Sequence, residues 1–347
     1  MKTNWNLKRF AITTIILSLI AIIPGSVESK PNRNNGDVTI RVTIDAPKES
    51  RNVRLWIPYP VSDRYQSISD ITIKGNFSSR SISAEGSTGN LALYAEWKEP
   101  VTGERYVDLS FNAVALERFN KDFALGKSEL PAEVKPYLRA TRFIPVDGKI
   151  REIALKATKG KESTVDKARA IYDWVIDNTS RDPNVKGCGL GDVEKTLAAK
   201  SGKCADISTV YVALARAAGV PAREVFGLRL SKKPGTSDMT SGHHCWSEFY
   251  APGYGWVPVD PADVRKLMLV QNLNLKQAKD YREYYFGTVG ANRIVLGHGG
   301  RGYYLNPKQK AGPLNYFMYP YAEVDGKSLE WLAAQKRLKY KITYKSL

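Results

Sequence analysis

Residues 202–223 read GKCADISTVYVALARAAGVPAR, and this pattern predicts a helix that begins at a cysteine. The helix is expected to run from Cys204 to Ala218 and to end at Gly219, because glycine adopts the conformation that commonly follows a helix. At a helix start, unpaired backbone N–H groups and the helix dipole favour the thiolate over the thiol. The thiolate is the reactive form of cysteine, so Cys204 is the candidate nucleophile.

A nucleophilic cysteine needs a base within hydrogen-bond reach and a third group that orients this base. Only three histidines can supply an imidazole: His243, His244 and His298. His298 lies in the glycine-rich run GHGGRG and is expected on a flexible loop. His243 is expected to be a packed or rim residue, which leaves His244 as the candidate base.

The geometry of a predicted hairpin also favours His244. Residues 243–250 and 256–260 are predicted strands, and the segment APGYG between them has the composition of a turn. With the turn centred near Gly253, the position opposite His244 is about 262. Asp260 is then a near-diagonal neighbour across the hairpin, where its carboxylate can hold the imidazole in one tautomer.

A second carboxylate, Asp263, competes with Asp260 for the role of the orienting group. Asp263 lies beyond Pro261, where the strand must have ended, and Asp260 is therefore preferred. Together Cys204, His244 and Asp260 form a nucleophile, a base and an orienting carboxylate, as in the triads of serine and cysteine hydrolases.

Three stretches carry a resemblance to a known family: GKCAD at 202–206, ARAAGVPAR at 215–223, and HCWSEFY with GYGWVPVDP within 244–261. In order and spacing they resemble the transglutaminase-like superfamily. The resemblance implies a papain-like α+β fold, in which a helix that carries the cysteine packs on an antiparallel sheet that carries the histidine and the aspartate. It also implies that Cys204, His244 and Asp260 are the catalytic triad.

The chemistry implied by this resemblance is acyl transfer on a peptide or protein substrate, without a cofactor. The Cys204 thiolate attacks a carboxamide, His244 protonates the leaving amine, and water or a second amine resolves the thioester. The backbone N–H of Cys204 is one natural donor to the oxyanion. Transglutaminases use an upstream Trp or Tyr as the second donor, but residues 178–185 contain Arg181 and no aromatic residue, so the second donor is not assigned.

The regions around these motifs predict the domain organisation. Apolar and polar residues alternate between about 37 and 116, which indicates a small antiparallel β unit. We predict a β-rich N-terminal domain at 30–125 and a transglutaminase-like domain at 126–347, whose final segment is basic and rich in tyrosine. Lysines alternate with apolar residues at 339–345, which predicts an edge strand.

The first 29 residues have the pattern of a secretory signal peptide. Lys2, Lys8 and Arg9 precede an uncharged apolar run at 10–23, which is shorter than the roughly 20 residues of a membrane-spanning helix. We therefore expect a bacterial protein that is secreted or periplasmic and has no integral membrane segment after cleavage.

Charge and composition limit the partners. The 347 residues are 43% hydrophobic and carry a formal net charge of +17, which points to anionic surroundings such as a cell-envelope polymer. No nucleic-acid recognition motif is visible, and the export signal argues against such a partner. Two hypotheses follow. The chain is an exported cysteine-dependent hydrolase or acyltransferase, or it is a catalytically silent envelope-binding protein that keeps the fold.

Three cysteines in an oxidising compartment allow one disulfide. Pairing Cys188 with Cys245 would leave Cys204 free and stiffen the strand that carries His244. A metal site built from Cys204, His244 and Asp260 with either of the other cysteines is disfavoured, because these scattered positions contain no C-x-x-C pair.

Overall fold

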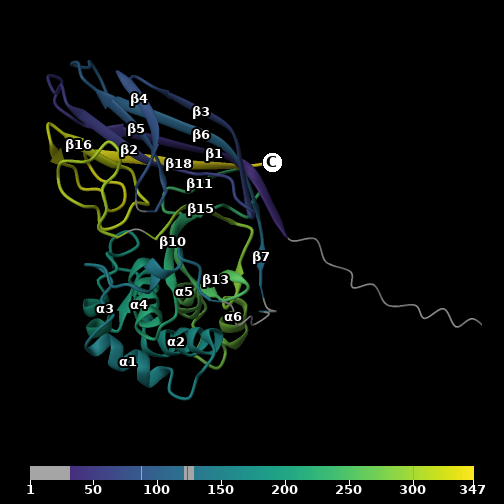
Figure 1. The fold of residues 1–347 in the computed structure, drawn as a ribbon. Coiled ribbons are helices and arrows are strands. Elements are labelled where there is room, and N and C mark those ends of the chain that lie inside the picture. Colours follow the sequence, from purple (N-terminus) through teal and green to yellow (C-terminus); the bar gives the residue numbers. More distant parts are fainter. Residues whose placement is uncertain (1–31, 87, 121–122, 124–128, 300) are drawn as a thin grey trace, which may run out of the picture. The chain divides into compact units, whose positions relative to one another are not determined.

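The structure is a computed structural model that describes residues 32–347, except for 87, 121–122, 124–128 and 300 (Figure 1). The predicted signal peptide at 1–29 therefore lies outside the described residues. None of the helices in the described part of the chain is long and apolar enough to span a bilayer.

The described chain alternates between a strand-rich and a helix-rich region. The helices are η1 (Lys135–Leu138), α1 (Lys149–Ala157), α2 (Thr164–Asn178), α3 (Val193–Ala199), α4 (Cys204–Ala217), α5 (Pro261–Gln271) and α6 (Lys279–Tyr284). The strands are β1 (Arg33–Ile44), β2 (Val53–Tyr59), β3 (Gln66–Gly75), β4 (Ser79–Ala84), β5 (Leu91–Trp97), β6 (Arg105–Leu116), β7 (Arg118–Phe119), β8 (Ser180–Arg181), β9 (Ser201–Gly202), β10 (Ala222–Arg229), β11 (Thr236–Asp238), β12 (His243–Ala251), β13 (Gly255–Val259), β14 (Thr288–Val289), β15 (Arg293–His298), β16 (Tyr321–Val324), β17 (Lys327–Ser328) and β18 (Leu338–Ser346).

Two five-stranded sheets form the β-rich region, with strand orders β11-β18-β1-β6-β3 and β17-β16-β2-β5-β4. Strand β1 illustrates why these segments form strands with one buried face. Val38, Ile40, Val42 and Ile44 are all buried, while the residues between them are more exposed. This alternation is the period of two that the sequence predicts. The inward residues of both sheets belong to one hydrophobic cluster, so each sheet covers the apolar face of the other.

The second region contains a four-stranded antiparallel sheet of order β13-β12-β10-β15. Helix α4 packs on β12 and β10 and is surrounded by α1, α2, α3 and α5, as the cluster of helices in Figure 1 shows. Every residue of α4 except Ala217 is buried, and its polar side chains, such as Asp206 and Thr209, are hydrogen-bonded. The structure confirms the predicted α+β class, with the Cys204 helix on the antiparallel sheet that carries His244.

Strand β18 differs from its predicted position. It lies between β11 and β1 and is not at the edge of the sheet. Leu338, Tyr340, Ile342 and Tyr344 are buried on its inner face, and β11 pairs with residues 343–345 on the side of the strand that was expected to be open. Likewise β16 pairs with β2, so residues 321–346 complete both sheets of the β-rich region. The predicted domain boundaries stay predictions.

The glycine-rich loop at 187–191, which reads GCGLG, fixes the start of α4. The Asp206 carboxylate accepts hydrogen bonds from the backbone N–H groups of Gly191 (2.8 Å) and Lys203 (2.9 Å). Gly189 has φ +90°, and a Cβ at this position would lie 1.9 Å from Asp206 Oδ2. Asp192 caps the helix α3 that follows the loop. The loop thus holds Asp206, and Asp206 holds the first turn that contains Cys204.

We expect Gly189→Ala to destabilise the protein by about 2 kcal/mol more than Gly219→Ala, because it adds steric overlap to an unfavourable φ. Gly219 is the matched control, since it has φ +79° and open space around its Cα. Urea unfolding followed by circular dichroism measures both values. Equal losses in the two variants would contradict the role given to the loop.

Candidate active site

The candidate nucleophile is Cys204, the first residue of α4. Its side chain is 1% exposed and borders a cavity of about 320 Å³. A residue at this position has a backbone N–H without an intrahelical acceptor, so one oxyanion donor is available beside the thiol. The neighbouring Ala205 N–H donates to the carbonyl of Cys188 (2.8 Å), which anchors the first turn to the preceding loop.

The structure brings the three predicted catalytic residues together. His244 Nε2 lies 2.7 Å from Asp260 Oδ2, and both side chains are buried. Cys204 and His244 border the same cavity, and the imidazole is one of the groups that lower the pKa of the thiol. Because Nε2 is directed at the carboxylate, Nδ1 is the ring nitrogen left for the thiol. The arrangement places one imidazole between a thiol and a carboxylate. The catalytic roles of the three residues stay predictions.

The hairpin that carries His244 has the predicted register. Ser247 pairs with Val259, which is the register expected from a turn centred near Gly253, and the pairing ends there, before the chain enters α5 at Pro261. Asp260 follows the end of β13 and caps α5, where its Oδ1 accepts from the N–H of Asp263 (2.8 Å). Pro261 at the first helical position has a φ suited to the helix. The strand-to-helix junction therefore fixes the carboxylate under the imidazole.

Arg293 is a site residue that the motifs did not reveal. Its Nη1 donates to Asp260 Oδ2 (2.7 Å), the oxygen that also contacts His244. Its second amino group pairs with Asp263, and Asp263 also pairs with Arg229. Arg293 lies on β15, far from the motifs in sequence, so no local pattern could have identified it.

Asp263 is therefore not a distant competitor of Asp260 but a neighbour in the same charge cluster. Its Oδ1 lies 3.8 Å from His244 Nε2, farther than the 2.7 Å of Asp260. Burial opposes its ionisation, but His244, Arg293 and Arg229 outweigh burial and hold the pKa of Asp263 far below its usual range. Asp263 is thus a fixed negative charge beside the imidazole.

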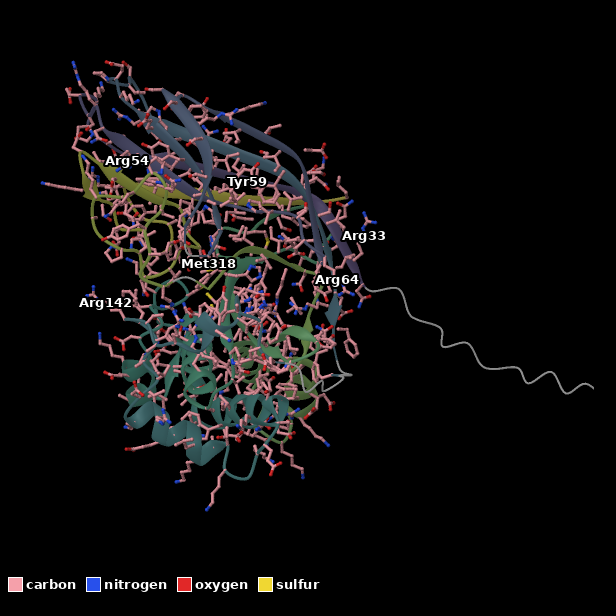
Figure 2. The ribbon with its side chains drawn as sticks, viewed as in Figure 1. Arg33, Arg54, Tyr59, Arg64, Arg142 and Met318 are labelled. Atoms are coloured by element: carbon pink, nitrogen blue, oxygen red, sulfur yellow. The ribbon has the colours of Figure 1, made fainter. Side chains whose placement is uncertain are left out.

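Three sulfur atoms gather at the nucleophile. The Sγ atoms of Cys188, Cys204 and Cys245 lie within 4.8 Å of one another, and all three cysteines are free. Figure 2 labels Met318, whose Sδ lies 3.7 Å from the Sγ of Cys245. The sequence showed three cysteines but could not place them in one cluster. The pairing of Cys188 with Cys245 stays a prediction.

This cluster affects the acidity of the thiols. Burial opposes ionisation of Cys204, but hydrogen bonds from Cys188, Cys245 and His244 prevail and hold its pKa well below the ordinary range. The contact with Cys204 raises the pKa of Cys188, and burial raises that of Cys245. The two neighbours therefore stay protonated, and their S–H groups donate to the His243 carbonyl (3.4 Å, from Cys188) and to Met318 Sδ (3.7 Å, from Cys245).

Two groups of residues offer atoms that a metal ion could use. One consists of the three thiols, and the other of His244, Asp260 and Asp263. In the second group the carboxylates already pair with Arg293 and Arg229, which would repel a cation. The first group would suit a soft metal, at the cost of occupying the nucleophile.

The other two histidines lie outside the chain of contacts from thiol to carboxylate. His243 borders the cavity and packs against Tyr319, with 4.4 Å between ring centroids, and burial lowers its pKa to about 4. His298 is the last residue of β15, and its backbone bonds to Asn90. The predicted loop position of His298 is wrong, because His298 pairs with Val225 of β10 as part of the strand, and the Asn90 side chain binds its backbone N–H and C=O.

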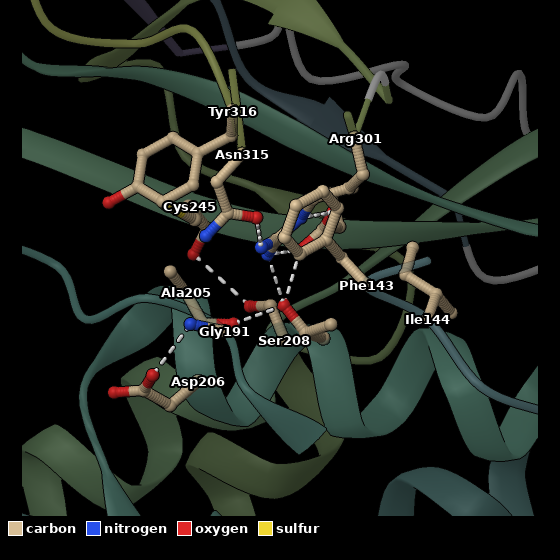
Figure 3. A network of polar contacts seen from close by, with 12 residues as sticks. Phe143, Ile144, Gly191, Ala205, Asp206, Ser208, Cys245, Arg301, Asn315 and Tyr316 are labelled. Carbon is tan, nitrogen blue, oxygen red and sulfur yellow. Dashed lines mark hydrogen bonds and ion pairs between the residues drawn. The ribbon is translucent and has the colours of Figure 1, made fainter. Parts of the chain in front are cut away.

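A buried ion pair supports α4 from the side (Figure 3). The Arg301 Nε donates to Glu224 (2.7 Å), and Nη1 donates to the carbonyl of Leu190 (2.8 Å) and to Asn315 (2.7 Å). Arg301 and Glu224 also contact Thr209 of α4. The network joins the glycine-rich loop, α4 and β10. It therefore fixes the position of the loop relative to the helix.

Comparisons with known proteins give a consistent result. The family model described as the transglutaminase-like superfamily matches residues 151–261. An uncharacterized protein of Haemophilus influenzae is 33% identical, over 97% of this chain and 99% of the relative. The uncharacterized protein YebA of Bacillus subtilis is 29% identical, over 33% of this chain and 17% of that protein.

A solved structure has a similar fold. It is described as a putative cysteine protease from Cytophaga hutchinsonii and has a TM-score of 0.56 with 14% identity. The similarity covers 91% of this chain and 99% of that one.

The lowered pKa of Cys204 predicts an unusual pH profile of alkylation. Because the thiolate reacts, labelling by iodoacetamide should stay fast at about pH 6, whereas a free cysteine slows about tenfold per pH unit below about 8.5. Mass spectrometry of the peptide that contains Cys204 measures the rate. His244→Ala should move the profile toward that of a free thiol. A wild-type midpoint near 8.5 would contradict the prediction.

Arg293→Met should destabilise the protein by about 3–5 kcal/mol, because it leaves buried carboxylates without their cation. Arg293→Lys keeps the charge but cannot bind both carboxylates as the guanidinium does, and its loss of unfolding free energy should be smaller. Urea unfolding at neutral pH measures both variants. If Arg293 also positions Asp260, the lysine variant will shift the pH profile of Cys204 alkylation. Wild-type stability of Arg293→Met would refute the assignment.

Proposed function

Because the chain belongs to the transglutaminase-like superfamily, we propose that it is an exported cysteine-dependent enzyme that cleaves or exchanges amide bonds in peptides or proteins. The observation that carries the proposal is the arrangement of Cys204, His244 and Asp260, in which a thiol of lowered pKa meets an imidazole held at 2.7 Å by a buried carboxylate. Export is supported by the signal-like pattern of residues 1–29.

The proposed reaction has two steps. The Cys204 sulfur bonds to the carbonyl carbon, the C–N bond breaks, and the proton held by His244 passes to the leaving amine. In the second step water or a primary amine attacks the thioester and gives its proton to His244 as the C–S bond breaks. The Cys204 N–H donates to the oxyanion in both steps. Asp260 keeps the imidazole in the tautomer that both transfers require.

The fixed charges around His244 suit this cycle. Asp260 and Asp263 stabilise the imidazolium that exists when Cys204 is a thiolate, and Arg293 with Arg229 prevents the two carboxylates from repelling each other. Because all of these groups are largely buried, little water screens the interactions. These charges thus favour the thiolate form of Cys204, whose pKa is held well below its ordinary range.

We expect Cys204→Ala to lower hydrolysis of a mixture of fluorogenic peptides by about 10⁴-fold or more, the scale of losing a nucleophile. The exposed-surface variant Lys161→Ala serves as the control and should retain full activity. Thermal unfolding of both variants shows whether the fold is intact. Adding a labelled primary amine separates the outcomes, since incorporation of the label indicates transfer and free acid indicates hydrolysis.

Retained activity in folded Cys204→Ala would refute an enzyme that depends on this thiol. The alternative of a catalytically silent envelope-binding protein predicts no turnover in the wild type and salt-sensitive binding to anionic envelope fractions that Cys204→Ala leaves unchanged.

A further inference from the structure

We propose that the cavity beside Cys204 is a binding site for a carboxylate, so that the favoured substrate carries a negatively charged group next to the amide that reacts. This inference rests on the proposed function and adds the class of substrate to it. The cavity has a volume of about 320 Å³, enough for a few residues of an extended peptide.

Cations line this cavity. It is bordered by Arg181, Gly187, Cys188, Lys203, Cys204, Arg229, Thr240, Ser241, His243, His244, Lys266, Tyr319, Ala333 and Tyr340. Among these described lining residues there are four Arg or Lys side chains and no Asp or Glu. The four come from separate elements, namely β8, the residue before α4, the end of β10, and α5. The charge is therefore a property of the assembled cavity and not of one basic segment.

Three of these cations lack a counter-charge. Arg229 pairs with Asp263, but in the described part of the chain no carboxylate lies within ion-pair distance of Arg181, Lys203 or Lys266. All three are only partly exposed. Cations elsewhere in the site, such as Arg293, are fully matched by acids. The unmatched charge thus faces the space in which a substrate would lie.

The cations also lie close enough to affect one another. Burial, followed by the charges of Arg229 and Arg181, lowers the pKa of Lys266, while Asp263 and Cys204 oppose the shift. Holding like charges together in a partly buried site costs free energy, which an anion in the cavity would recover. The Thr240 and Ser241 hydroxyls provide further donors at the same wall. A carboxylate would neutralise the positive charge of the cavity and accept hydrogen bonds from its donors.

A carboxylate is the anion that peptides carry, either on Asp and Glu side chains or at a chain end. One other role for the cations is to stabilise the thiolate of Cys204 alone. The two roles differ in what they do to an incoming reagent. Cations that are neutralised by the thiolate change the rates of charged and neutral reagents alike, whereas cations in excess of the thiolate charge favour the anionic reagent.

The test compares iodoacetate with iodoacetamide on Cys204, by mass spectrometry of the peptide that contains it. These reagents deliver nearly the same group with and without a carboxylate. We expect the iodoacetate-to-iodoacetamide rate ratio to exceed that of glutathione by roughly tenfold, the lower range for electrostatic focusing in a cleft. High salt should reduce this ratio.

The variant pair is R181Q/K266Q, with R151Q/K161Q as the control that removes two exposed charges from α1 and the segment after it. The first should return the ratio to that of glutathione, and the second should keep the wild-type value. A ratio that starts at the glutathione value, or that R181Q/K266Q leaves unchanged, overturns the carboxylate site.

A second arm uses peptides that differ only in carrying Glu or Gln beside the scissile bond. We expect the wild type to favour the Glu peptide in kcat/KM and R181Q/K266Q to lose this preference. If no peptide reacts but the alkylation ratio behaves as expected, the proposed function fails and the carboxylate site stands. If peptides react without any preference for Glu, the carboxylate site fails and the proposed function stands.

Discussion

The Asp260 carboxylate is the group on which the arrangement of the site depends. It is completely buried, yet it accepts hydrogen bonds from His244, Arg293 and the backbone N–H of Asp263. An isolated buried carboxylate would take up a proton, and it would then no longer hold a charged imidazole. The cation on β15 and the helix start of α5 make its negative charge tolerable. Three elements must therefore assemble correctly before the thiol has an effective partner.

The nucleophile is supported from the opposite side by the packing of α4. This helix is enclosed by the sheet and by other helices, and the Asp206 carboxylate ties its first turn to the glycine-rich loop. The Arg301–Glu224 pair ties the same loop and helix to β10, which pairs with the strand of His244. Cys204 and His244 thus lie on α4 and β12, which pack in the same core. The packing of these two elements fixes the separation of the two residues.

The sequence was sufficient for features that depend on short stretches of chain. The Cys204 helix, the hairpin register and the approach of Asp260 to His244 follow from spacing, because a helix start and a tight turn leave few geometries. Arg293, the sulfur cluster and the inner position of β18 were not predicted. Each results from contacts between segments that are distant in sequence. The local sequence around an Arg, a Cys or a Lys-rich strand does not identify the segment that it contacts. Asp260-Pro261 did carry an unused signal, since Asp before Pro is a common helix start.

The pairing of β1 with β18 also constrains when the protein can fold. These strands are nine paired positions long and lie about three hundred residues apart in sequence. During synthesis β1 is made about three hundred residues before β18, so one of its two hydrogen-bonding edges stays without its native partner until residues 338–346 exist. The β-rich region consequently closes only after residues 338–346 have been made. Its folding is dominated by contacts of very long range, which is the topology expected to fold slowly.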